Sequence, residues 1–343
     1  MLARKLPSIV LLALVGACLG ALAQNVKVTF LGSHAGELCA RDRATIFEDP
    51  TGVRILYDAG QSVTGADDAR LGRVDVVLLS HAHGDHIGDQ KLKSLEAGSC
   101  DSPQVVSAAP NSTTAEIAAA KNSALIMIAP LGAFIGRKIE AIRGKPTGVC
   151  PQSGEALVAP FAAPCLATVQ TGGTRIVKAS GASKGLEIAS VPAAHDSALP
   201  IALLSETERK AVEADNVTFE MGPPIGYVIR FTNGLVAYLS VDTGMHSDMR
   251  TVVHDYYKAS LVQLNYGATA LDAEGAAYVV NTLVQPASVI ISHVNEAATS
   301  GGKVKPGTRT AAFIALVTGR PVYPALSGKT LEFDGSGKCV AGC

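Results

Sequence analysis

The chain has 343 residues, of which 48% are hydrophobic and 17% are charged, and its formal net charge at pH 7 is −1. This length and composition are those of a globular protein with one large domain or two smaller ones. Because the sequence contains no basic stripe or block, we expect neither nucleic acid nor an anionic membrane surface as a partner, and the expected partner is a small-molecule substrate.

The first 23 residues predict an export signal that is not part of the fold. Arg4 and Lys5 precede an apolar run over residues 9–22, and residues 21–23 (Ala-Leu-Ala) fit a small-residue cleavage site. The run is too short for a comfortable membrane span. We therefore expect residues 1–23 to be removed and the protein to be periplasmic or secreted. A lipid anchor at Cys18 is the alternative interpretation.

Six cysteines remain after the export signal, and an even number in an exported chain indicates disulfides. Six cysteines allow fifteen pairings, so their spacing alone does not assign the partners. Cysteine as a metal ligand is the weaker alternative, because no close Cys-x-x-Cys pair is present. The six are Cys39, Cys100, Cys150, Cys165, Cys339 and Cys343.

Hydrophobic patterning predicts a strand, a hairpin and a second strand before residue 80. Residues 26–31 alternate between apolar and polar side chains, as in a half-buried strand. Residues 44–48 and 53–57 predict a hairpin across the turn at residues 49–52 (Asp-Pro-Thr-Gly). The apolar run at residues 74–79 predicts a buried strand.

The mature chain, 24–343, is expected to form a single domain with an insertion around residues 97–182. Within it the sequence predicts a strand at 104–108 and a helix at 112–122, with Ser112 near its N-terminal cap. Residues 131–174 are rich in Gly and Pro, and we interpret them as an irregular segment that is functional or pinned covalently.

Regular patterning returns after residue 183 and continues to a Cys-bearing tail at 335–343. The segment 203–221 precedes the strand predicted at 225–231, and it is interpreted either as a lid or as a surface excursion. Strands are predicted at 186–191, 225–231, 235–241, 261–264, 288–291 and 329–333, and helices at 205–214, 247–257, 272–283 and 308–317.

The loop after the strand at 74–79 carries a concentration of metal-ligand side chains. His81, His83 and His86 together with Asp85 fall within six residues, although the whole chain has only eight histidines. Imidazole nitrogens and carboxylate oxygens suit zinc and similar divalent ions. A His-rich surface turn without function is the alternative, and the clustering argues against it.

Three later strands also deliver a His or an Asp at their carboxyl ends. His195, Asp242 and His293 follow the strands predicted at 186–191, 235–241 and 288–291. Strand-end loops at one edge of a sheet are where α/β folds place their sites. The sequence therefore predicts that these residues and the His-rich loop form one metal site.

The order of these residues, His-x-His-x-Asp-His followed by a His, an Asp and a His, resembles the metallo-β-lactamase superfamily. Residues 191–195, 226–230, 242–249, 272–277 and 289–293 are similar to the branch that contains the ascorbate-6-phosphate lactonase and other metal-dependent hydrolases. The resemblance implies an α/β fold, the four-layer αββα sandwich. It also implies two divalent ions, zinc foremost, with manganese or iron fitting the same ligands.

By this resemblance His81, His83 and His195 would hold the first ion, and Asp85, His86 and His293 the second, with Asp242 bridging both. Two close dications need a shared anionic ligand, which agrees with a carboxylate at position 242. True β-lactamases of the superfamily commonly have Cys or Ser there, so Asp242 favours the lactonase and phosphodiesterase side.

The expected function is an exported dinuclear hydrolase of a small phosphodiester or lactone. A hydroxide that bridges the two ions would attack, and Asp85 would relay the proton to the leaving group. A periplasmic β-lactamase-type amide hydrolase and a metal-binding protein without catalysis are the alternatives.

Four further residues are candidates for orienting a ligand or contacting substrate. His34 either orients a ligand or is a plain surface-turn His. Asp58 follows the hairpin directly and precedes the metal loop. His246 lies four residues after Asp242, and it either reaches the pocket or is a helix-terminal His without a role. Tyr266 follows a strand and could hydrogen-bond substrate.

Overall fold

The computed structural model describes residues 24–151, 154–267 and 270–343, which contain two large mixed β-sheets. The nine strands of the first sheet are, in spatial order, β21 (Cys339–Ala341), β20 (Thr330–Phe333), β1 (Val26–Phe30), β2 (Thr45–Glu48), β3 (Arg54–Tyr57), β4 (Val76–Leu78), β7 (Ala124–Ile126), β10 (Cys165–Leu166) and β8 (Gly148–Val149).

The second sheet has eight strands, and it also contains both parallel and antiparallel pairs. In spatial order they are β19 (Val322–Pro324), β16 (Ser288–Ser292), β15 (Leu261–Asn265), β14 (Val236–Leu239), β13 (Ile225–Arg230), β12 (Leu186–Pro192), β11 (Thr174–Ala179) and β9 (Leu157–Ala159). Two short ribbons pair β5 (Gln90–Leu92) with β6 (Val105–Ser107) and β17 (Thr299–Ser300) with β18 (Lys303–Val304).

The two sheets pack against each other through apolar side chains and a few polar contacts. The rings of Phe47 and Phe231 stack with centroids 6.0 Å apart. The hydroxyl of Tyr227, on β13, lies 2.8 Å from the carbonyl oxygens of Leu79 and Ile126 in the first half. These contacts join the inner faces of the sheets, so a single core lies between them.

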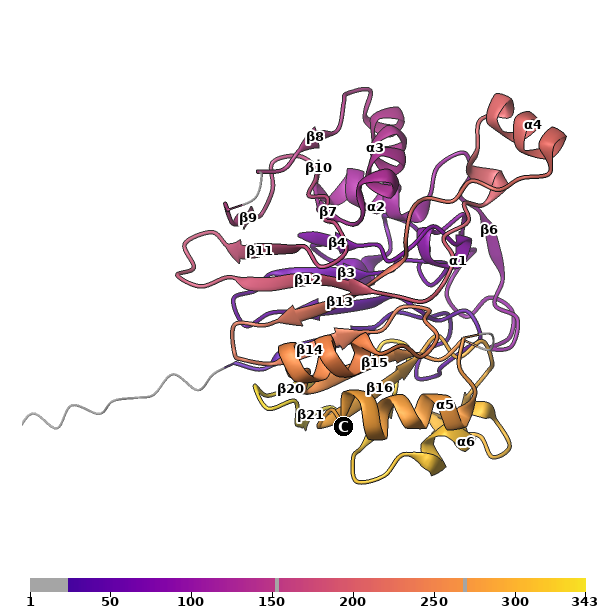
Figure 1. The fold of residues 1–343 in the computed structure, drawn as a ribbon. Helices are drawn as coiled ribbons and strands as arrows, with labels where there is room; N and C mark the ends of the chain where they lie inside the picture. Colours follow the sequence, from indigo (N-terminus) through magenta and orange to yellow (C-terminus); the bar gives the residue numbers. More distant parts are fainter. Residues whose placement is uncertain (1–23, 152–153, 268–269) are drawn as a thin grey trace, which may run out of the picture.

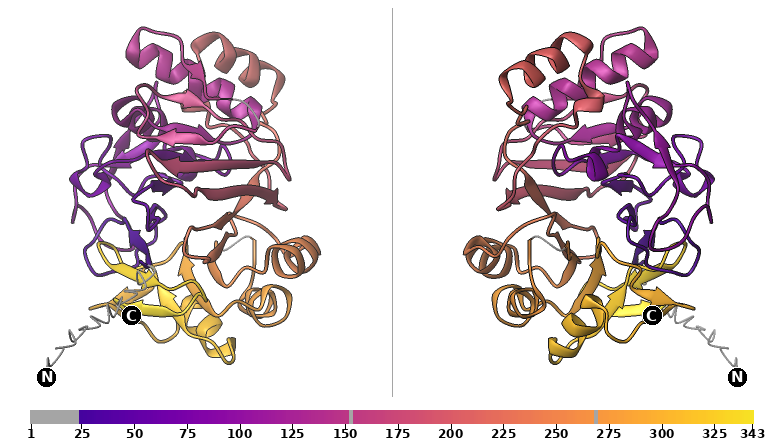
Figure 2. Two further views of the ribbon diagram at one scale, coloured as in Figure 1. Left: turned by 90° about the vertical axis from the view of Figure 1, so that its left-hand side faces the viewer. Right: turned by 90° about the vertical axis from the view of Figure 1, so that its right-hand side faces the viewer.

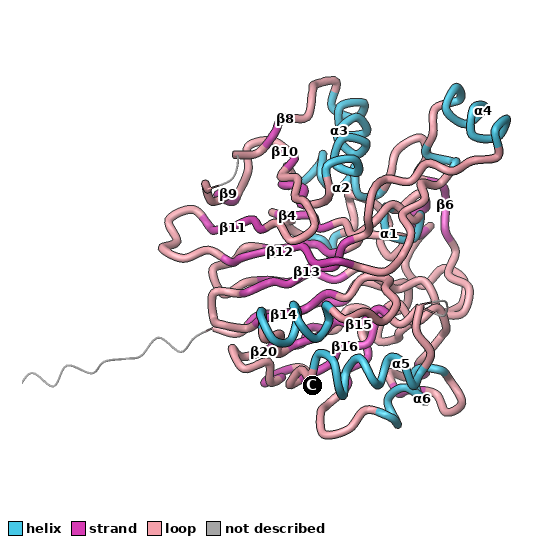
Figure 3. Tube along the Cα trace, viewed as in Figure 1, coloured by secondary structure: helices cyan, strands magenta, loops and turns pink. Residues whose placement is uncertain are grey.

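Helices cover the outer faces, and Figure 3 shows the strands in the middle with the helices outside. In Figure 2 the magenta helices of the first half and the orange helices of the second half lie at separate ends of the molecule. The helices are α1 (Gly84–Ile87), α2 (Thr113–Lys121), α3 (Ala129–Arg143), α4 (Glu206–Asp215), α5 (Ala273–Tyr278) and α6 (Arg309–Leu316), with 3₁₀ turns η1 (Ala69–Leu71) and η2 (Ile201–Leu203) and π-helices η3 (Met249–Tyr257) and η4 (Val279–Val284).

This arrangement confirms the expected α/β class and most of the predicted elements. The hairpin, the strand before the His-rich loop and the helix capped by Ser112 lie where the sequence predicts them. The helix predicted from Asp272 divides into α5 and η4, and the one at 247–257 is π-helical. The predicted element types are confirmed because the apolar residues of each element recur at helix or strand spacing, and these residues are buried in the core.

The prediction of an irregular segment at 131–174 is wrong over its first third, where α3 runs from Ala129 to Arg143. Two glycines that suggested turns lie inside this helix. A Cβ at Gly132 would come within 2.9 Å of Thr168, and one at Gly136 within 3.1 Å of Leu166. Both glycines therefore allow close packing of α3 on the strand below it, a role that the sequence does not distinguish from a turn.

The segment 97–182, predicted to be an insertion, contributes strands to both sheets: β7, β10 and β8 to the first, β9 and β11 to the second. The tail 335–343 adds β21 at the edge of the first sheet. The export signal and the lipid-anchor alternative at Cys18 lie outside the described residues. Among the described residues, no helix is both long enough and apolar enough to cross a bilayer.

The six cysteines of the mature chain lie in three pairs at disulfide distance. The pairs are Cys39 with Cys100, Cys150 with Cys165, and Cys339 with Cys343. Formation of these bonds stays a prediction, and it is tested below.

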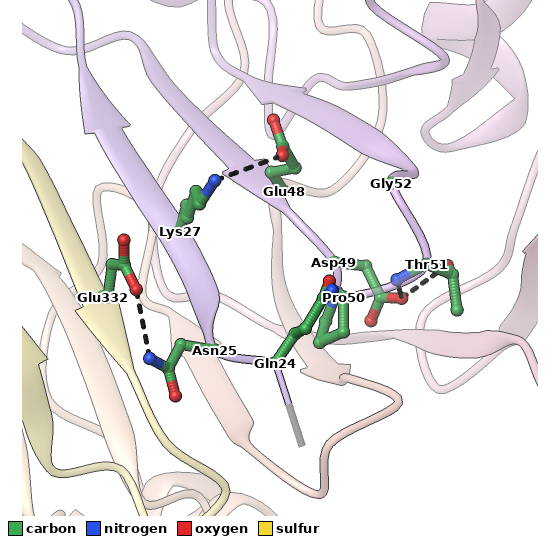
Figure 4. A pocket seen from close by; sticks show the side chains of 9 residues that line it. All are labelled: Gln24, Asn25, Lys27, Glu48, Asp49, Pro50, Thr51, Gly52 and Glu332. Atoms are coloured by element: carbon green, nitrogen blue, oxygen red, sulfur yellow. Dashed lines mark hydrogen bonds and ion pairs between the residues drawn. The ribbon is translucent and has the colours of Figure 1, made fainter. Parts of the chain in front are cut away.

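A cavity of about 570 Å³ lies beside the first described residue, where β1 begins and β2 ends. Figure 4 shows its lining, including the Lys27–Glu48 ion pair at 3.9 Å and the hydrogen bond from Asn25 to Glu332 at 3.0 Å. The His-rich loop follows the carboxyl end of β4, at the opposite edge of the sheet. This cavity is therefore separate from the candidate site described next.

Candidate metal centre

The fold gathers all seven predicted ligands at one edge of the two sheets. His81 and His83 lie in the loop between β4 and α1, and Asp85 and His86 lie in α1. His195, Asp242 and His293 follow β12, β14 and β16. Because β14, β15 and β16 are parallel, their carboxyl ends reach the same edge. Figure 1 shows α1, which contains Asp85 and His86, on the right-hand side of the molecule, below α4.

Strained backbone lies beside two of the ligands. Val241, which precedes Asp242, has φ +56°, and His293 itself has φ +51°. Left-handed backbone is unfavourable for β-branched and bulky residues and persists only where the surroundings impose it. The turn at each strand end therefore carries a conformational cost at the position that turns a ligand toward the cluster.

Three overlapping groups of side chains offer ligand atoms within 4.8 Å of one another. His81 belongs to two of the groups and His86 to two, so the groups form one continuous cluster. Asp242 belongs to the middle group, between the outer two. The groups are His81, His83 and His195; His81, His86 and Asp242; and Asp85, His86 and His293.

The buried half of the cluster contains His86, His293 and two carboxylates. The Nε2 atoms of His86 and His293 lie 3.1 Å apart. Asp242 Oδ2 lies 3.4 Å from the first and 3.2 Å from the second. Asn265 donates its Nδ2 proton to Asp242 Oδ1 at 3.1 Å, which leaves Oδ2 facing the histidines.

The charges of this half favour a cation. Burial lowers the pKa of His86, but the carboxylates of Asp242, Asp85 and Asp58 outweigh burial and raise it to about 10. The raised pKa of His86 shows that the negative charge of the carboxylates exceeds the positive charge around this ring. The same carboxylates would stabilise a divalent ion bound here.

Asp58 lies in contact with this half, as the sequence suggested. His86 Nδ1 donates to Asp58 Oδ2 at 2.8 Å, while Ser80 donates its backbone N–H at 2.9 Å and its hydroxyl at 2.7 Å. Asp58 thereby orients the His86 ring and leaves Nε2 available as a ligand.

The more exposed half contains His81, His83 and His195. His83 Nε2 donates to Asp196 Oδ2 at 2.9 Å, which leaves its Nδ1 lone pair available. His81 Nδ1 lies 2.9 Å from Ser80 Oγ, and its Nε2 is buried without a partner among the described residues. Burial, the largest cause, lowers the pKa of His81, so this ring is neutral and able to act as a ligand.

Arg43 is a residue of the site that the sequence interpretation missed. Its Nη2 lies 2.6 Å from Asp85 Oδ2 and donates to Asn295 Oδ1 at 2.8 Å. Burial raises the pKa of Asp85, but Arg43, His86 and His293 together hold it well below its usual value. A carboxylate held this firmly ionised is a weak proton acceptor, so these contacts favour Asp85 as a ligand over the expected proton relay.

The sequence interpretation also missed Asp196, Ser80 and Asn265, although a sequence signal for each of them was present. Asp196 and Ser80 adjoin predicted ligands in sequence, which is a usable signal for residues that orient ligands. Asn265 ends β15, so its strand-end position was also readable. Arg43 begins the segment that leads into β2, where nothing local distinguishes it from a surface arginine.

Asp42, beside Arg43, is a buried carboxyl that accepts the backbone N–H groups of Ser33 at 2.8 Å and Cys39 at 2.9 Å. Burial raises its pKa to about 6 despite these hydrogen bonds and despite Arg43. The folded state then binds the proton more tightly than the unfolded state, so stability from this group is present below pH 4 and declines as the pH rises to 6.

We expect Asp42→Asn to remove this pH dependence. The shift corresponds to about 2 kcal/mol between pH 4 and pH 7 in the free energy of unfolding. Urea unfolding of both proteins at several pH values measures it, as the difference between their two curves. Parallel curves for the two proteins would contradict the assignment.

For two of the other candidate residues, no described side-chain contact reaches the seven predicted ligands, and their roles stay predictions. Tyr266 is buried, its ring packs on Phe313 with centroids 5.4 Å apart, and the Arg309 guanidinium lies 4.5 Å from its centroid. His34 contacts Ser33 Oγ at 3.0 Å and the Gly98 carbonyl at 3.3 Å, neither of which belongs to a predicted ligand. Strand-end position indicated the edge of the sheet but not the direction of these side chains.

His246, the fourth candidate, has a half-buried ring whose pKa is lowered by burial, and Asp248 is the charged group beside it. Its backbone carbonyl accepts from Met249 at the start of η3. No described contact joins its ring to the seven ligands, which agrees with the alternative of a helix-terminal His.

The seven residues fit divalent metal ions on structural grounds. A buried imidazole nitrogen without a hydrogen-bond partner is unfavourable in a folded protein, and among the described residues the cluster contains one in His81 Nε2. The His86 and His293 Nε2 atoms face each other at 3.1 Å with a carboxylate oxygen beside both. An ion coordinated by imidazole and carboxylate explains this convergence.

Comparison with known proteins agrees with this geometry. The family model of the metallo-β-lactamase superfamily matches residues 44–91. A UPF0173 metal-dependent hydrolase from Polynucleobacter asymbioticus is 25% identical over 296 residues, which cover 83% of this chain and 81% of the relative. Another, from Cupriavidus taiwanensis, is 28% identical over 233 residues, which cover 68% of this chain and 62% of that relative.

A solved structure shares the fold. It is Igni18, described as a metallo hydrolase, from the archaeon Ignicoccus hospitalis. The superposition has a TM-score of 0.53 at 20% sequence identity, and it covers 90% of this chain and 99% of the other. The narrower resemblance to the ascorbate-6-phosphate lactonase branch is not confirmed by these comparisons.

Proposed function

We propose that the chain is a member of the metallo-β-lactamase superfamily, and that it is an exported metal-dependent hydrolase with two divalent ions that cleaves a small phosphodiester or lactone. The observation that best supports this proposal is that the three ligand groups form one continuous cluster. His81 and His86 are each shared by two groups, and Asp242 lies between the outer groups. Two ions bridged by one carboxylate would account for all seven residues.

Divalent ions at this centre would lower the pKa of a water molecule toward neutrality and polarise an oxygen of the substrate. Zinc suits five histidines and two carboxylates best, and manganese or iron would suit the same set. Other residues of the chain orient the ligands. Asp58 and Asp196 orient His86 and His83, while Asn265 holds Asp242 with one oxygen toward the cluster.

Asp242 supports ester cleavage over β-lactam cleavage. The β-lactamases of this superfamily commonly place Cys or Ser at this position, whereas a carboxylate supplies a full negative charge between two cations. We therefore include a β-lactam as a comparison substrate in the test, and we do not propose β-lactamase activity.

The excursion at 203–221 would lie beside the substrate. Ser197, at its base, accepts the backbone N–H of Ala82 in the metal loop at 3.1 Å, and Ala198 bridges to Glu220. Beyond this base, Ile201, Val217 and Phe219 expose between 41% and 55% of their surface. Exposed apolar side chains on a segment whose base is anchored to the metal loop favour a substrate with an apolar group, which this excursion would cover as a lid.

The three cysteine pairs support export, because disulfides persist in oxidising compartments. N-terminal sequencing of the secreted or periplasmic protein tests this part. A mature start at Gln24 is expected, whereas a lipidated Cys18 or an uncleaved cytosolic chain would overturn it.

Metal removal tests the proposed activity. The purified protein is screened with phosphodiester, lactone, sulfate ester and β-lactam substrates, each with short and long apolar groups. We expect hydrolysis of a phosphodiester or lactone, loss of at least 99% of the rate after dialysis against a chelator, and recovery with two equivalents of zinc. A rate that survives metal removal would contradict the proposal.

A further inference from the structure

Arg43 is a buried cation in direct contact with a predicted metal ligand. Only 6% of its side chain is exposed, and its Nη2 contacts both Asp85 Oδ2 at 2.6 Å and Asn295 Oδ1 at 2.8 Å. Asp85 belongs to the first half of the chain and Asn295 to the loop after His293. The guanidinium therefore joins the two halves of the molecule at the buried end of the cluster.

The cation is confined to one end of the cluster. Of the Lys and Arg residues that the structure describes, Arg43 alone forms an ion pair with a predicted ligand. The opposite end has an anion, since Asp196 Oδ2 lies 2.9 Å from His83 Nε2 and Asp196 Oδ1 lies 3.8 Å from His195 Nδ1. The two ends therefore present very different potentials to an arriving cation.

Arg43 contacts the oxygen that the second ion would need. Asp85 Oδ2 accepts from Arg43 and also lies 3.3 Å from His293 Nε2, on the side of the predicted ligands. A divalent ion on this oxygen would lie within a few ångströms of the guanidinium, at a separation where repulsion between partly buried charges is strong. Fixing the Asp85 side chain in one rotamer to bind the ion would also cost conformational entropy, but this cost is far smaller than the repulsion between the ion and the guanidinium.

The charge cannot easily move away when an ion arrives. Arg43 Nε and Nη1 are buried without a hydrogen-bond partner in the described part of the chain, so no second site for the guanidinium is prepared. Arginine also keeps its proton at any pH at which the protein is folded. Repulsion of the second ion is thus a permanent property of the site.

We propose that Arg43 makes the two cation sites unequal. The site of His81, His83 and His195 fills first, and the site of Asp85, His86 and His293 fills only at higher metal concentration because Arg43 competes for Asp85. The inference rests on the proposed two-ion function. It makes the availability of metal a control on how many protein molecules carry both ions.

Calorimetric titration of the metal-free full-length mature protein with zinc alone tests this inference. The wild type is expected to bind two ions with affinities that differ by at least tenfold. Arg43→Gln removes the charge and is expected to tighten the weaker ion at least tenfold, with the tighter ion changed less than threefold. Arg43→Lys keeps the charge and is expected to leave both affinities within threefold of the wild type.

A second variant covers the case in which Arg43→Gln does not fold. Asn295→Asp retains the arginine and places a carboxylate 2.8 Å from its Nη2, which offsets the charge in place. It is also expected to tighten the weaker ion about tenfold. Circular dichroism and the melting temperature of each metal-free protein report whether it is folded.

The two proposals fail in different ways. A wild-type protein that binds no zinc overturns the proposed function itself. Two ions of equal affinity in the wild type, or a weaker ion whose affinity is unchanged or reduced in both Arg43→Gln and Asn295→Asp, overturns the role of Arg43 and leaves the hydrolase standing.

Discussion

Replacement of Asp242 with Asn is expected to lower the rate of hydrolysis by about a thousandfold or more, which corresponds to about 4 kcal/mol of transition-state stabilisation. Asp242 Oδ2 lies within 3.4 Å of both buried imidazoles, and it is the carboxylate between the outer ligand groups. Asparagine has nearly the same shape but no charge, so two adjacent dications would lose the anion that offsets their repulsion.

The measurement combines metal content with steady-state kinetics. Metal analysis of the variant is expected to find about one ion per chain, and kcat is expected to fall more than KM rises. Asn265 would still meet the new side chain through its amide, so the fold is expected to persist, and circular dichroism checks this. Asp196→Asn serves as the matched control, because it neutralises a carboxylate that touches only the outside of the cluster, and a loss of tenfold or less is expected.

Full occupancy by two ions with a nearly normal rate in Asp242→Asn would contradict the bridging role. An equal loss in Asp196→Asn would show that general loss of negative charge, and not the position of Asp242, governs the activity.

Replacement of Cys39 and Cys100 with Ser is expected to lower the free energy of unfolding by roughly 4 kcal/mol. These cysteines are 61 residues apart in sequence, so a bond between them would strongly restrict the unfolded chain. The pair also joins the segment of Asp42 and Arg43 to the loop between β5 and β6, where Ala40 donates its N–H to the Cys100 carbonyl at 3.0 Å.

Denaturant unfolding of the oxidised proteins measures this effect. The pair Cys339 and Cys343 provides the control, because it closes a loop of only 4 residues and its removal is expected to cost roughly 2 kcal/mol. Peptide mapping without reduction checks the partners. Equal costs for the two pairs, or a peptide that links Cys39 to another cysteine, would refute the pairing.

The sequence could predict the ligands because their signal is local. His81, His83, Asp85 and His86 occur within six residues, and His195, Asp242 and His293 each follow an apolar run whose period marks a buried strand. Strand ends on one edge of a sheet meet in space, so the seven residues could be assigned to one site without coordinates.

The direction of a side chain could not be predicted in the same way. Tyr266 and Asn265 are neighbours at the end of β15, yet Asn265 reaches Asp242 at 3.1 Å while the Tyr266 ring packs on Phe313. Alternate residues of a strand point to opposite faces, and the sequence does not state which face meets the cluster. The same limit applies to Gly132 and Gly136, which are read as turn residues until the neighbouring strand is known.

By itself the sequence determined the fold class and predicted a set of candidate metal ligands and a metal-dependent hydrolase, because periodicity and ligand type are properties of short segments. The tertiary structure alone decided which charges surround that set. Arg43, Asp58 and Asp196 contact ligands that are 42, 28 and 113 residues away. Electrostatic interactions depend on distance in space, so the packing of the two sheets decides how unequal the two ends of the cluster are.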